Sequence, residues 1–282
     1  MTTTPFSHRV QDRLTPARVL PGRAAAAGFP DPPPDGVPTA LAVDLGSGCA
    51  QIWTPGRGMV IAPTSSDGPA PTAALVNRGR VVNPAGCVAL LNRLLRHYPQ
   101  PLPTGPVVLA CCPVLATPAD TAILRQVLTT VFDPARLRFI PSVRAAAIGA
   151  GTAAGVLLVA DVGSQLTEVA ILSDGRVVAA RRADTGTRDL TRHATPDMVA
   201  HTVARLVSEL RRDHAGRDLA GHALRRGLLL VGDGAARPEL PGRMTAALGA
   251  AVRPAATPHT AALRGAGIVA LAACRNPTAA AV

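Results

Sequence analysis

Two glycine-containing turns in the sequence each follow an aspartate that ends a short apolar run. The first turn lies at 41–53, in LAVDLGSGCAQIW, and its aspartate is Asp44. The second lies at 159–172, in VADVGSQLTEVAIL, and its aspartate is Asp161. Glycine lets backbone N–H groups approach phosphate oxygens, and a carboxylate at the end of a strand can hold a magnesium ion through its water shell. Two such β-hairpins facing each other would hold one nucleotide between them.

The elements around the two turns repeat in the same order. A single Gly-Ser turn is usually only a turn, so each hairpin alone is weak evidence for phosphate binding. After each hairpin, however, the apolar patterns predict a third strand and then helix, strand, helix, strand and helix. Alternation of strands and helices is typical of α/β folds. The sequence therefore predicts one plan used twice, in two lobes.

The expected elements divide the chain into two similar halves. The first half is expected to contain, beyond its hairpin, strands at 58–62, 107–112 and 137–140, and helices at 84–98, from 117, and at 142–151. The second half is expected to contain strands at 156–160, 167–172, 176–181, 228–231 and around 252, and helices from 195, through 244–248, and from 257. These positions predict lobes at 40–151 and 152–274, between a disordered proline-rich leader at 1–39 and a tail at 275–282.

The charge of the chain limits its partners. All 29 basic residues are arginine and face 18 acids, which gives a formal net charge of +11. The arginines are spread over both halves, and aromatic residues make up only 2% of the chain, so no specific nucleic-acid surface with stacking rings is predicted. A nucleotide or an anionic membrane surface is compatible with this charge.

The cysteines favour a reducing compartment. They form no C-x-x-C pair, and the seven histidines show no metal-binding spacing. No stretch approaches the ~18 apolar residues of a membrane span, and the N-terminus lacks the compact apolar segment of a secretory signal. We therefore expect a cytoplasmic protein with reduced cysteines, most of them in apolar runs. They are Cys49, Cys87, Cys111, Cys112 and Cys274.

Four segments together resemble the actin-like ATPase superfamily, and within it the MreB group of rod-shape-determining proteins. The run DLGSGCAQIWTPGRGMVIAPT resembles the first phosphate motif of that group, and DVGSQLTEVAILS resembles the second. AAAIGAG at 145–151 resembles the helix that joins the lobes, and VGDGAA at 231–236 resembles the adenosine loop. The resemblance spans about 41–271. It implies a two-lobed actin-like fold of the ribonuclease-H-like class, with a mixed sheet and flanking helices in each lobe in the order βββαβαβα.

The resemblance also implies that ATP or ADP binds with Mg²⁺ between the lobes. Asp44 and Asp161 would hold the hydrated metal ion. The backbone groups that would meet the β-phosphate side are those of Ser47, Gly48 and Cys49, and those that would meet the γ-phosphate side are Gly163, Ser164 and Gln165. The segment that would pass beside the sugar and base is Asp233, Gly234, Ala235 and Ala236, with Arg237 near enough to stack or to hydrogen-bond.

Departures from the family pattern predict weak binding and slow hydrolysis. Ser164 and Gln165 stand in the glycine-rich turn of the second motif, where side chains would oppose a close approach of phosphate. Ser142 occupies the place of the acid that normally positions the attacking water, and 138–152 contains no carboxylate. Only 63–83 and 183–194 occupy the places of the two outer subdomains of filament-forming members. Both subdomains are therefore expected to be missing, with weaker and less selective purine binding.

Two main functional hypotheses remain open at this point. The first is a trimmed MreB-like protein that binds ATP or ADP and acts with shape or cell-wall machinery, with self-association as a further possibility. The second is a non-enzymatic scaffold that keeps the fold as an interaction platform. A small-molecule kinase of the same superfamily would need a further aspartate as a base, and the sequence offers no clear candidate. A nuclease would need an acidic cluster within one lobe, whereas Asp44 and Asp161 belong to different lobes.

Overall fold

The computed structural model describes residues 18–20, 39–64, 74–190 and 195–275 of the chain. The first half of this part contains β1 (Arg18–Leu20), β2 (Ala40–Leu45), β3 (Cys49–Thr54), β4 (Gly58–Pro63), β5 (Val76–Asn77), β6 (Arg80–Val81), α2 (Pro84–Leu95), β7 (Val107–Cys112), α3 (Pro118–Phe132), β8 (Arg136–Pro141) and α4 (Ser142–Gly149). The second half contains β9 (Val156–Val162), β10 (Thr167–Ser173), β11 (Arg176–Ala183), η1 (Thr187–Asp189), α5 (Pro196–Arg212), α6 (Arg217–Arg226), β12 (Leu228–Val231), η2 (Asp233–Ala236), α7 (Glu239–Leu248), β13 (Val252–Pro254) and α8 (Ala261–Arg275).

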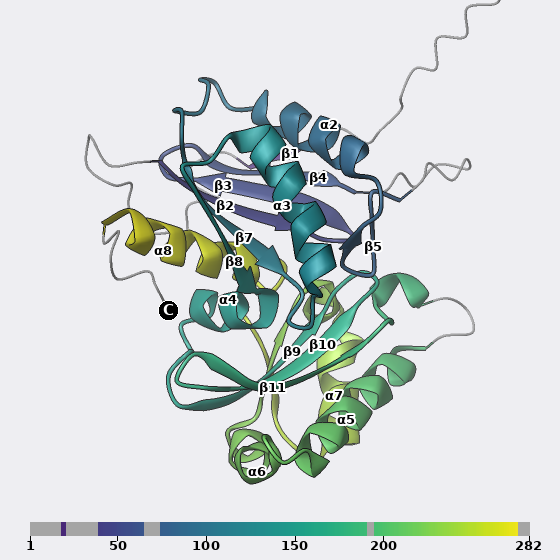
Figure 1. The fold of residues 1–282 in the computed structure, drawn as a ribbon. Coiled ribbons are helices and arrows are strands. Elements are labelled where there is room, and N and C mark those ends of the chain that lie inside the picture. Colours follow the sequence, from purple (N-terminus) through teal and green to yellow (C-terminus); the bar gives the residue numbers. More distant parts are fainter. Residues whose placement is uncertain (1–17, 21–38, 65–73, 191–194, 276–282) are drawn as a thin grey trace, which may run out of the picture.

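Two mixed sheets form two lobes, which lie one above the other in Figure 1. The strand order is β1-β4-β3-β2-β7-β8 in the first sheet and β11-β10-β9-β12-β13 in the second. In both sheets an antiparallel group of strands, β4-β3-β2 or β11-β10-β9, continues into two parallel strands. The α/β fold in two lobes, predicted from the repeated order of elements, and the mixed sheet in each lobe, implied by the family resemblance, are therefore confirmed.

The alternation of side chains along β2 explains how the first sheet is covered. Leu41 and Val43 pack with α2 and α3 on one face, whereas Ala40 and Ala42 pack with α8 on the other. Because successive residues of a strand point to opposite faces, Asp44 continues the Ala40 and Ala42 face beyond the core. The carboxylate is thereby directed toward the space between the lobes.

The second sheet is built in the same way around β9. Leu158 and Ala160 pack with α5, α6 and α7 on the outer face, and Leu157 and Val159 pack with α4 on the inner face. Asp161 continues the inner face, as Asp44 does in the first sheet. Both aspartates therefore end the innermost apolar row of their sheet and face the same space.

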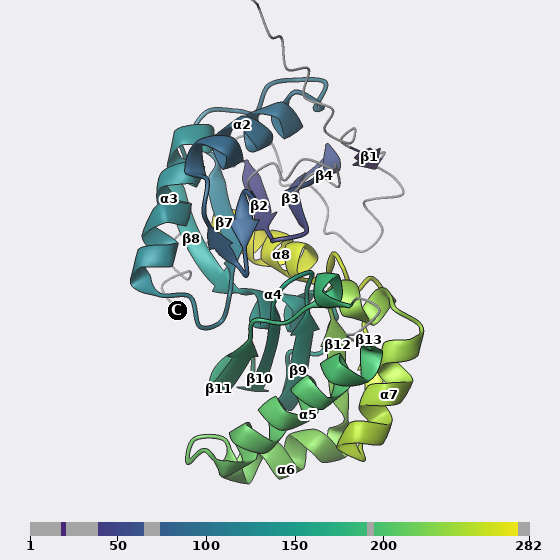
Figure 2. The same ribbon diagram turned by 90° about the vertical axis from the view of Figure 1, so that its right-hand side faces the viewer.

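Helices α4 and α8 cross between the lobes, as Figures 1 and 2 show. A side chain at Gly149 would collide with the backbone of Ala261, and one at Gly265 would collide with the carbonyl of Ala145, so the crossing requires glycine at both positions. Helix α8 belongs to the second half of the chain but covers the first sheet, and α4 belongs to the first half but packs on the second sheet. A boundary at 151/152 thus separates the sheets but not the helices that cover them.

The ends of the helices follow local sequence signals. Thr117 Oγ1 accepts a hydrogen bond from the backbone of Asp120 at 3.2 Å, and the Asp120 carboxylate accepts one from the backbone of Thr117 at 3.0 Å. This reciprocal pair starts α3 at the predicted place. Helix α4 ends at Gly149, two residues before the expected end, and α2 ends at Leu95 rather than at Tyr98.

One helix and three short strands of the structure are absent from the sequence-based prediction. Helix α6 follows α5, the short strands β5 and β6 form a hairpin between β4 and α2, and β1 pairs with β4 in antiparallel register. Strand β1 comes from the segment expected to be a disordered leader; it extends the sheet beyond β4, and the rest of 1–39 lies outside the described residues apart from Thr39. The expected tail lies outside them too, beyond Arg275.

Two further features agree with the sequence analysis. In the part of the chain that the structure describes, no helix combines the length and the apolar content needed to cross a bilayer. All five cysteines are free, and all of them except the half-buried Cys49 are buried.

Candidate functional site

The tips of the two inner hairpins share one backbone geometry. In the first hairpin the Gly46 amide donates to the Cys49 carbonyl at 2.9 Å, and in the second the Gly163 amide donates to the Leu166 carbonyl at 2.9 Å. Each turn also accepts a hydrogen bond from a residue beyond the third strand, which in the second lobe is the Thr187 amide, 2.9 Å from the Gly163 carbonyl. The Thr64 hydroxyl donates to the Gly46 carbonyl at 2.8 Å. The sequence repetition therefore corresponds to a structural repetition at the loops.

The strand register determines which side chains face each other behind each tip. Asp44 pairs across the strands with Gln51, and Asp161 pairs with Glu168. Residues directly opposite each other in an antiparallel pair point to the same face. Gln51 and Glu168 therefore face the interlobe space together with the aspartates. Sequence analysis missed both of them, although each stands seven residues after its aspartate in the repeated motif.

The two hairpins and the β12–η2 turn enclose a cavity of about 120 Å³. Its walls carry four carboxyl side chains, those of Asp44, Asp161, Glu168 and Asp233. Gly232, at φ +81°, permits this convergence, because a side chain there would collide with the Asp161 carboxylate. An outer hollow of about 530 Å³ adjoins the cavity. The residues common to both are Gly48, Cys49, Ser164 and Asp233, and the outer hollow adds Thr187, Arg188, Leu190 and Arg237.

The acids in the cavity bind their protons unusually tightly. Burial, reinforced by the charge of Asp233, raises the pKa of Asp44 to about 6. Burial and the charges of Asp44 and Asp233 raise the pKa of Asp161 to about 7. Burial raises the pKa of Asp233 as well, while His259, Arg188 and Arg237 oppose that shift. The aspartates therefore lie close enough to repel one another, and a cation placed among them would relieve both the repulsion and the cost of burial.

Two observations decide how a magnesium ion would fit this cavity. No group of three or more His, Cys, Asp or Glu side chains among the described residues is arranged to ligate a metal ion directly. The cavity volume of about 120 Å³ leaves room for several waters. Mg²⁺ commonly keeps several waters and is held by one or two carboxylates. The donor set therefore fits a hydrated magnesium ion and does not fit a directly ligated metal centre.

The backbone at the hairpin tips fits an anion in the outer hollow. In the described part of the chain, the amides of Ser47, Gly48, Ser164 and Gln165 donate to no backbone carbonyl of a turn or loop. Such amides can donate hydrogen bonds to the oxygens of a phosphate. The tips touch each other, because a Cβ added to Gly48 would lie 2.9 Å from Cβ of Ser164. Phosphate binding between the tips therefore requires the lobes to part slightly.

The cavity offers few groups that act as a base. Ser142 lines the wall and donates its hydroxyl to the Cys112 carbonyl at 3.1 Å. Glu168 accepts a hydrogen bond from the Val114 backbone at 2.8 Å and another from the backbone of Leu115. Burial, with the charge of Asp161, raises the pKa of Glu168 to about 8. At neutral pH this carboxyl is therefore mostly protonated and holds the loop after β7.

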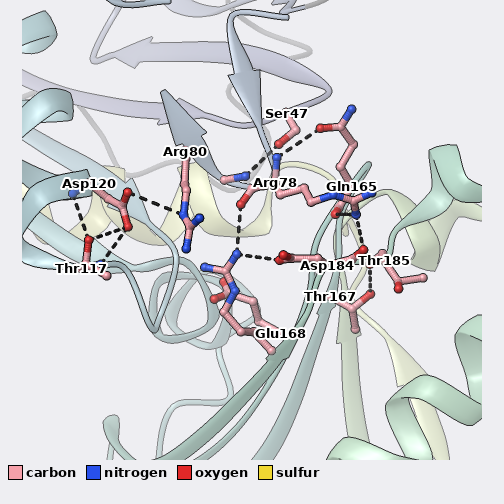
Figure 3. Close-up of polar contacts among 12 residues, drawn as sticks. Ser47, Arg78, Arg80, Thr117, Asp120, Gln165, Thr167, Glu168, Asp184 and Thr185 are labelled. Carbon is pink, nitrogen blue, oxygen red and sulfur yellow. Dashed lines mark hydrogen bonds and ion pairs between the residues drawn. The ribbon is translucent and has the colours of Figure 1, made fainter. Parts of the chain in front are cut away.

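The β5–β6 hairpin crosses from the first lobe to the second at the mouth of the cleft (Figure 3). Its tip, Arg78 and Gly79, has φ of +48° and +77°, as a two-residue turn between antiparallel strands requires. The Arg78 guanidinium donates to the Gln165 carbonyl at 3.2 Å and to the Asp184 carbonyl, and it lies 3.6 Å from the Asp189 carboxylate. In the other direction, the Gly79 amide donates to Ser47 Oγ at 3.0 Å.

The second lobe also reaches back to this tip. Gln165 Oε1 accepts a hydrogen bond from the Arg78 amide at 3.2 Å, and Arg182 donates to the Arg78 carbonyl at 3.2 Å. Arg182 itself is held by Asp184 at 2.8 Å. The Gln165 side chain is thus turned toward the β5–β6 hairpin. Within the described residues, this hairpin is the only regular structure between β4 and α2.

The residues predicted to form the site are brought together only in part. Those that line the cavity or the outer hollow are Asp44, Ser47, Gly48, Cys49, Asp161, Gly163, Ser164, Gln165, Asp233 and Arg237. Gly234, Ala235 and Ala236 line neither space. Gly234 is buried against Val162, where a side chain would collide, while Ala235 packs on the core of the second lobe. From η2, the structure places only Asp233 at the cleft.

Comparison with solved structures identifies the fold. MreB5 of Spiroplasma citri bound to AMPPNP matches with a TM-score of 0.74 and 15% identity, over 86% of this chain and 99% of that one. The same protein bound to ADP matches with a TM-score of 0.69 and 16% identity, over 85% and 98%. The ethanolamine utilization protein EutJ from Carboxydothermus hydrogenoformans matches with a TM-score of 0.61 and 17% identity, over 85% and 92%.

No model of a known protein family matches the sequence, and no curated protein matches it either. The structural likeness at these identities concerns the fold. It agrees with the resemblance carried by the two phosphate-type hairpins, the helix between the lobes and the VGDGAA segment. The chain thus has the two-lobed actin-like fold of MreB5 and EutJ.

Proposed function

We propose that the chain binds ATP or ADP, together with a hydrated magnesium ion, between its two lobes. The observation that carries the proposal is the convergence of Asp44, Asp161 and Asp233, from separate strands and turns, on one enclosed cavity. Burying three acids that repel one another is costly unless a cation joins them. The MreB5 structures were solved with AMPPNP and with ADP bound, which supports an adenine nucleotide as the ligand here.

The two spaces of the cleft would divide the ligand between them. Asp44 and Asp161 would hold the water shell of Mg²⁺ in the inner cavity, where the ion supplies neutralisation of phosphate charge. The amides of Ser47, Gly48 and Cys49, and those of Gly163, Ser164 and Gln165, would face the phosphates. The nucleoside would occupy the outer hollow near Arg237. In this arrangement Asp233 borders both spaces.

Hydrolysis is proposed to be slow. A general base must be unprotonated and free to accept a proton from water. Ser142 is a poor base, and Glu168 is mostly protonated at neutral pH, with its carboxyl engaged by the backbone of Val114. The bound nucleotide would therefore act mainly as a link between the lobes, whose opening and closing is the output.

A place in the cell is proposed from the fold, the cysteines and the charge of the chain. Cytoplasmic localisation agrees with five free cysteines. A link to cell shape or cell-wall machinery, and self-association, rest on the likeness to MreB5, while the likeness to EutJ shows that this fold also serves other cellular systems. Attraction to an anionic membrane surface is compatible with the formal net charge of +11.

Calorimetric titration of the whole chain with ATP tests the proposal. We expect saturable binding with one nucleotide per chain in the presence of Mg²⁺, and clearly weaker binding when EDTA removes the ion. Binding that is absent at millimolar ATP and Mg²⁺, in protein shown by circular dichroism to be folded, contradicts the proposal. ADP serves as the second ligand, because it lacks the phosphate group nearest the second hairpin.

The alternative function is a non-enzymatic interaction platform, and the β5–β6 hairpin is the observation that favours it. Arg78 joins the lobes directly through Gln165, Asp184 and Asp189. The inner cavity of about 120 Å³, taken without the outer hollow, is also smaller than the roughly 300–1,000 Å³ of common small-molecule sites. A platform of this kind would show no nucleotide binding even after the hairpin contacts are removed by Arg78→Ala, which distinguishes it from a site that is merely closed.

A further inference from the structure

A second cavity, of about 300 Å³, lies in the second lobe apart from the interlobe cleft and shares no lining residue with it. It is bounded by the end of α4, the edge formed by β12 and β13, and the first turn of α8. Its lining includes three arginines, Arg226, Arg253 and Arg264, and no carboxylate. Apolar side chains, among them Leu157 and Leu229, form much of the remaining wall.

The fold holds two of these arginines in place through backbone carbonyls. Arg226 ends α6, and its guanidinium donates to the Val156 carbonyl at 2.9 Å and more weakly to that of Ala154 at 3.4 Å. Arg253, on β13, donates to the Arg226 carbonyl. Gly227 makes this approach possible: its φ is +90°, and a Cβ there would lie 2.8 Å from the Ala251 carbonyl.

Arg264 completes the cluster from the first turn of α8. Its Nε atom is buried and has no hydrogen-bond partner among the described residues. Arg264 itself is half-buried, but a buried N–H group without a partner is costly, so this part of the side chain is incomplete without an acceptor. Arg226 and Arg253 are exposed, and they leave guanidinium N–H groups for a ligand at the mouth of the cavity.

The charge of the cluster is uncompensated. In the described part of the chain none of the three arginines forms an ion pair, whereas Arg181, Arg205 and Arg243 of the same lobe each pair with a carboxylate at 2.8 Å or less. Three cations around one cavity repel each other, and an anion between them turns this repulsion into attraction. The planar guanidinium group can donate two parallel hydrogen bonds to the oxygens of one phosphate, in bidentate geometry.

We propose that this cavity binds the phosphate group of a compact phosphorylated molecule, at a site separate from the nucleotide cleft. Its volume lies at the lower end of the roughly 300–1,000 Å³ of small-molecule sites, which suits a ligand smaller than a nucleotide. The phosphate lies among the arginine side chains, and Leu157, Leu229 and Ala255 cover the apolar part of the ligand. A phospholipid headgroup and a soluble phosphate ester share this chemistry.

Titration of the full chain with inorganic diphosphate in the absence of Mg²⁺ tests the site. The variant Arg253→Gln/Arg264→Gln keeps Arg226, which supports the backbone, and is expected to weaken binding at least about tenfold. The control Arg211→Gln/Arg225→Gln removes the same charge from exposed positions of α5 and α6 outside the cavity, and should change the affinity less than about twofold. Equal weakening by both variants, or no saturable binding to the unaltered chain, overturns the proposal.

A second variant covers the case in which the double substitution does not fold. Ala256→Glu places a carboxylate at an exposed position of the cavity lining, where it would pair with the arginines and compete with the ligand. Loss of diphosphate binding in this variant supports the proposal, and unchanged binding contradicts it. Sedimentation with vesicles that contain phosphatidic acid then distinguishes the two sources of phosphate. If the chain sediments with the vesicles and diphosphate abolishes this, the ligand is a lipid headgroup. If the chain binds diphosphate but does not sediment with the vesicles, the ligand is soluble.

Discussion

The two inner hairpins share a backbone but differ in charge. Both tips are closed by the same 2.9 Å hydrogen bond, and both place an aspartate opposite a polar residue. In the first hairpin that residue is Gln51, which is neutral and donates to the His259 carbonyl at 3.0 Å. In the second it is Glu168, whose carboxyl accepts hydrogen bonds from the loop after β7. The first hairpin therefore brings one acid to the cleft, and the second brings two.

This difference shows that the duplicated fold divides two tasks between its halves. The first hairpin binds the second half of the chain through an amide that does not titrate. The second binds the first half through a carboxyl whose pKa, raised to about 8 by burial, makes its charge depend on pH. Replacing a residue of one hairpin by its counterpart in the other is therefore the direct way to test which half carries the ionic part of the site.

The largest effect is expected at the metal site. Asp161→Asn should weaken magnesium-dependent ATP binding by about 10- to 100-fold, because Asp161 faces both other aspartates and is proposed to hold the water shell of the ion. Asp44→Asn should weaken this binding less, because the pKa of Asp44 is raised by burial and by the charge of Asp233 alone among the aspartates. Calorimetry provides the measurement, and Asp218→Asn, at an exposed position of α6, is the matched control. Equal affinities of the Asp161 and Asp218 variants would refute the assignment.

Stability should depend on pH through the second hairpin. The folded-state pKa values of Asp161 and Glu168, about 7 and about 8, lie above the ordinary values of 3.8 and 4.5. The folded protein therefore binds more protons than the unfolded chain between about pH 4 and 8, so its stability should fall as pH rises across this range and level off above it. Glu168→Gln should reduce this loss of unfolding free energy by on the order of 2 kcal/mol at pH 8, measured by urea unfolding.

The reciprocal change, in the first hairpin, should lower the unfolding free energy at high pH instead of preserving it. Gln51→Glu makes the first hairpin like the second, adds a carboxylate opposite Asp44 and removes the donor to the His259 carbonyl. We expect a loss of about 2 kcal/mol in unfolding free energy at pH 8, a smaller loss at pH 5, and partial recovery with Mg²⁺. A variant with unchanged stability at both pH values would show that position 51 does not face the acids.

The β5–β6 hairpin should control the rate of nucleotide entry. Arg78→Ala removes the contacts with Gln165, Asp184 and Asp189 and should increase the association rate of ATP several-fold in stopped-flow fluorescence with a labelled nucleotide. Arg80→Ala is the matched control, because Arg80 lies in the same hairpin but pairs with Asp120 of its own lobe at 3.7 Å. Equal rates for the two variants would exclude a role of Arg78 in holding the lobes together.

The smallest effect is expected at the tip of the second hairpin. Gln165 occupies the place that Gly48 has in the first tip, and its side chain accepts a hydrogen bond from the Arg78 amide at 3.2 Å. Gln165→Gly removes this bond and lets phosphate approach the backbone, so ATP affinity should rise by about two- to fivefold. Gln126→Gly is unsuitable as a control because it lies inside α3. Gln165→Ala, which removes the bond but retains a Cβ, separates the two causes.

Much of the fold and part of the site follow from the sequence because their signals are local. The apolar runs that end in Asp44 and Asp161 fix the direction of both carboxylates, since alternation along a strand places every second residue on one face. The capping pair of Thr117 and Asp120 likewise fixes the start of α3. Glu168 also had a local signal, its position seven residues after Asp161, where the first motif has Gln51.

Other features lacked such a signal. Helix α6 buries only Ala220 and Ala223, so it has no stripe of large apolar residues that a periodic pattern could detect. Strands β5 and β6 have two residues each, too few for alternation to appear. The packing of α8 on the first sheet depends on contacts between distant parts of the chain, and only Gly149 and Gly265 hint at the close crossing of α4 and α8.

A crystal structure of the chain grown with AMPPNP and Mg²⁺ would show whether the two hairpins hold a nucleotide and its metal ion between the lobes. We expect a hydrated ion between Asp44 and Asp161, phosphates at the tips that carry Gly48 and Ser164, and a nucleoside in the hollow beside Arg237. A nucleotide bound elsewhere, or a cleft that stays closed with Asp44 and Asp161 in contact only with protein, would contradict it.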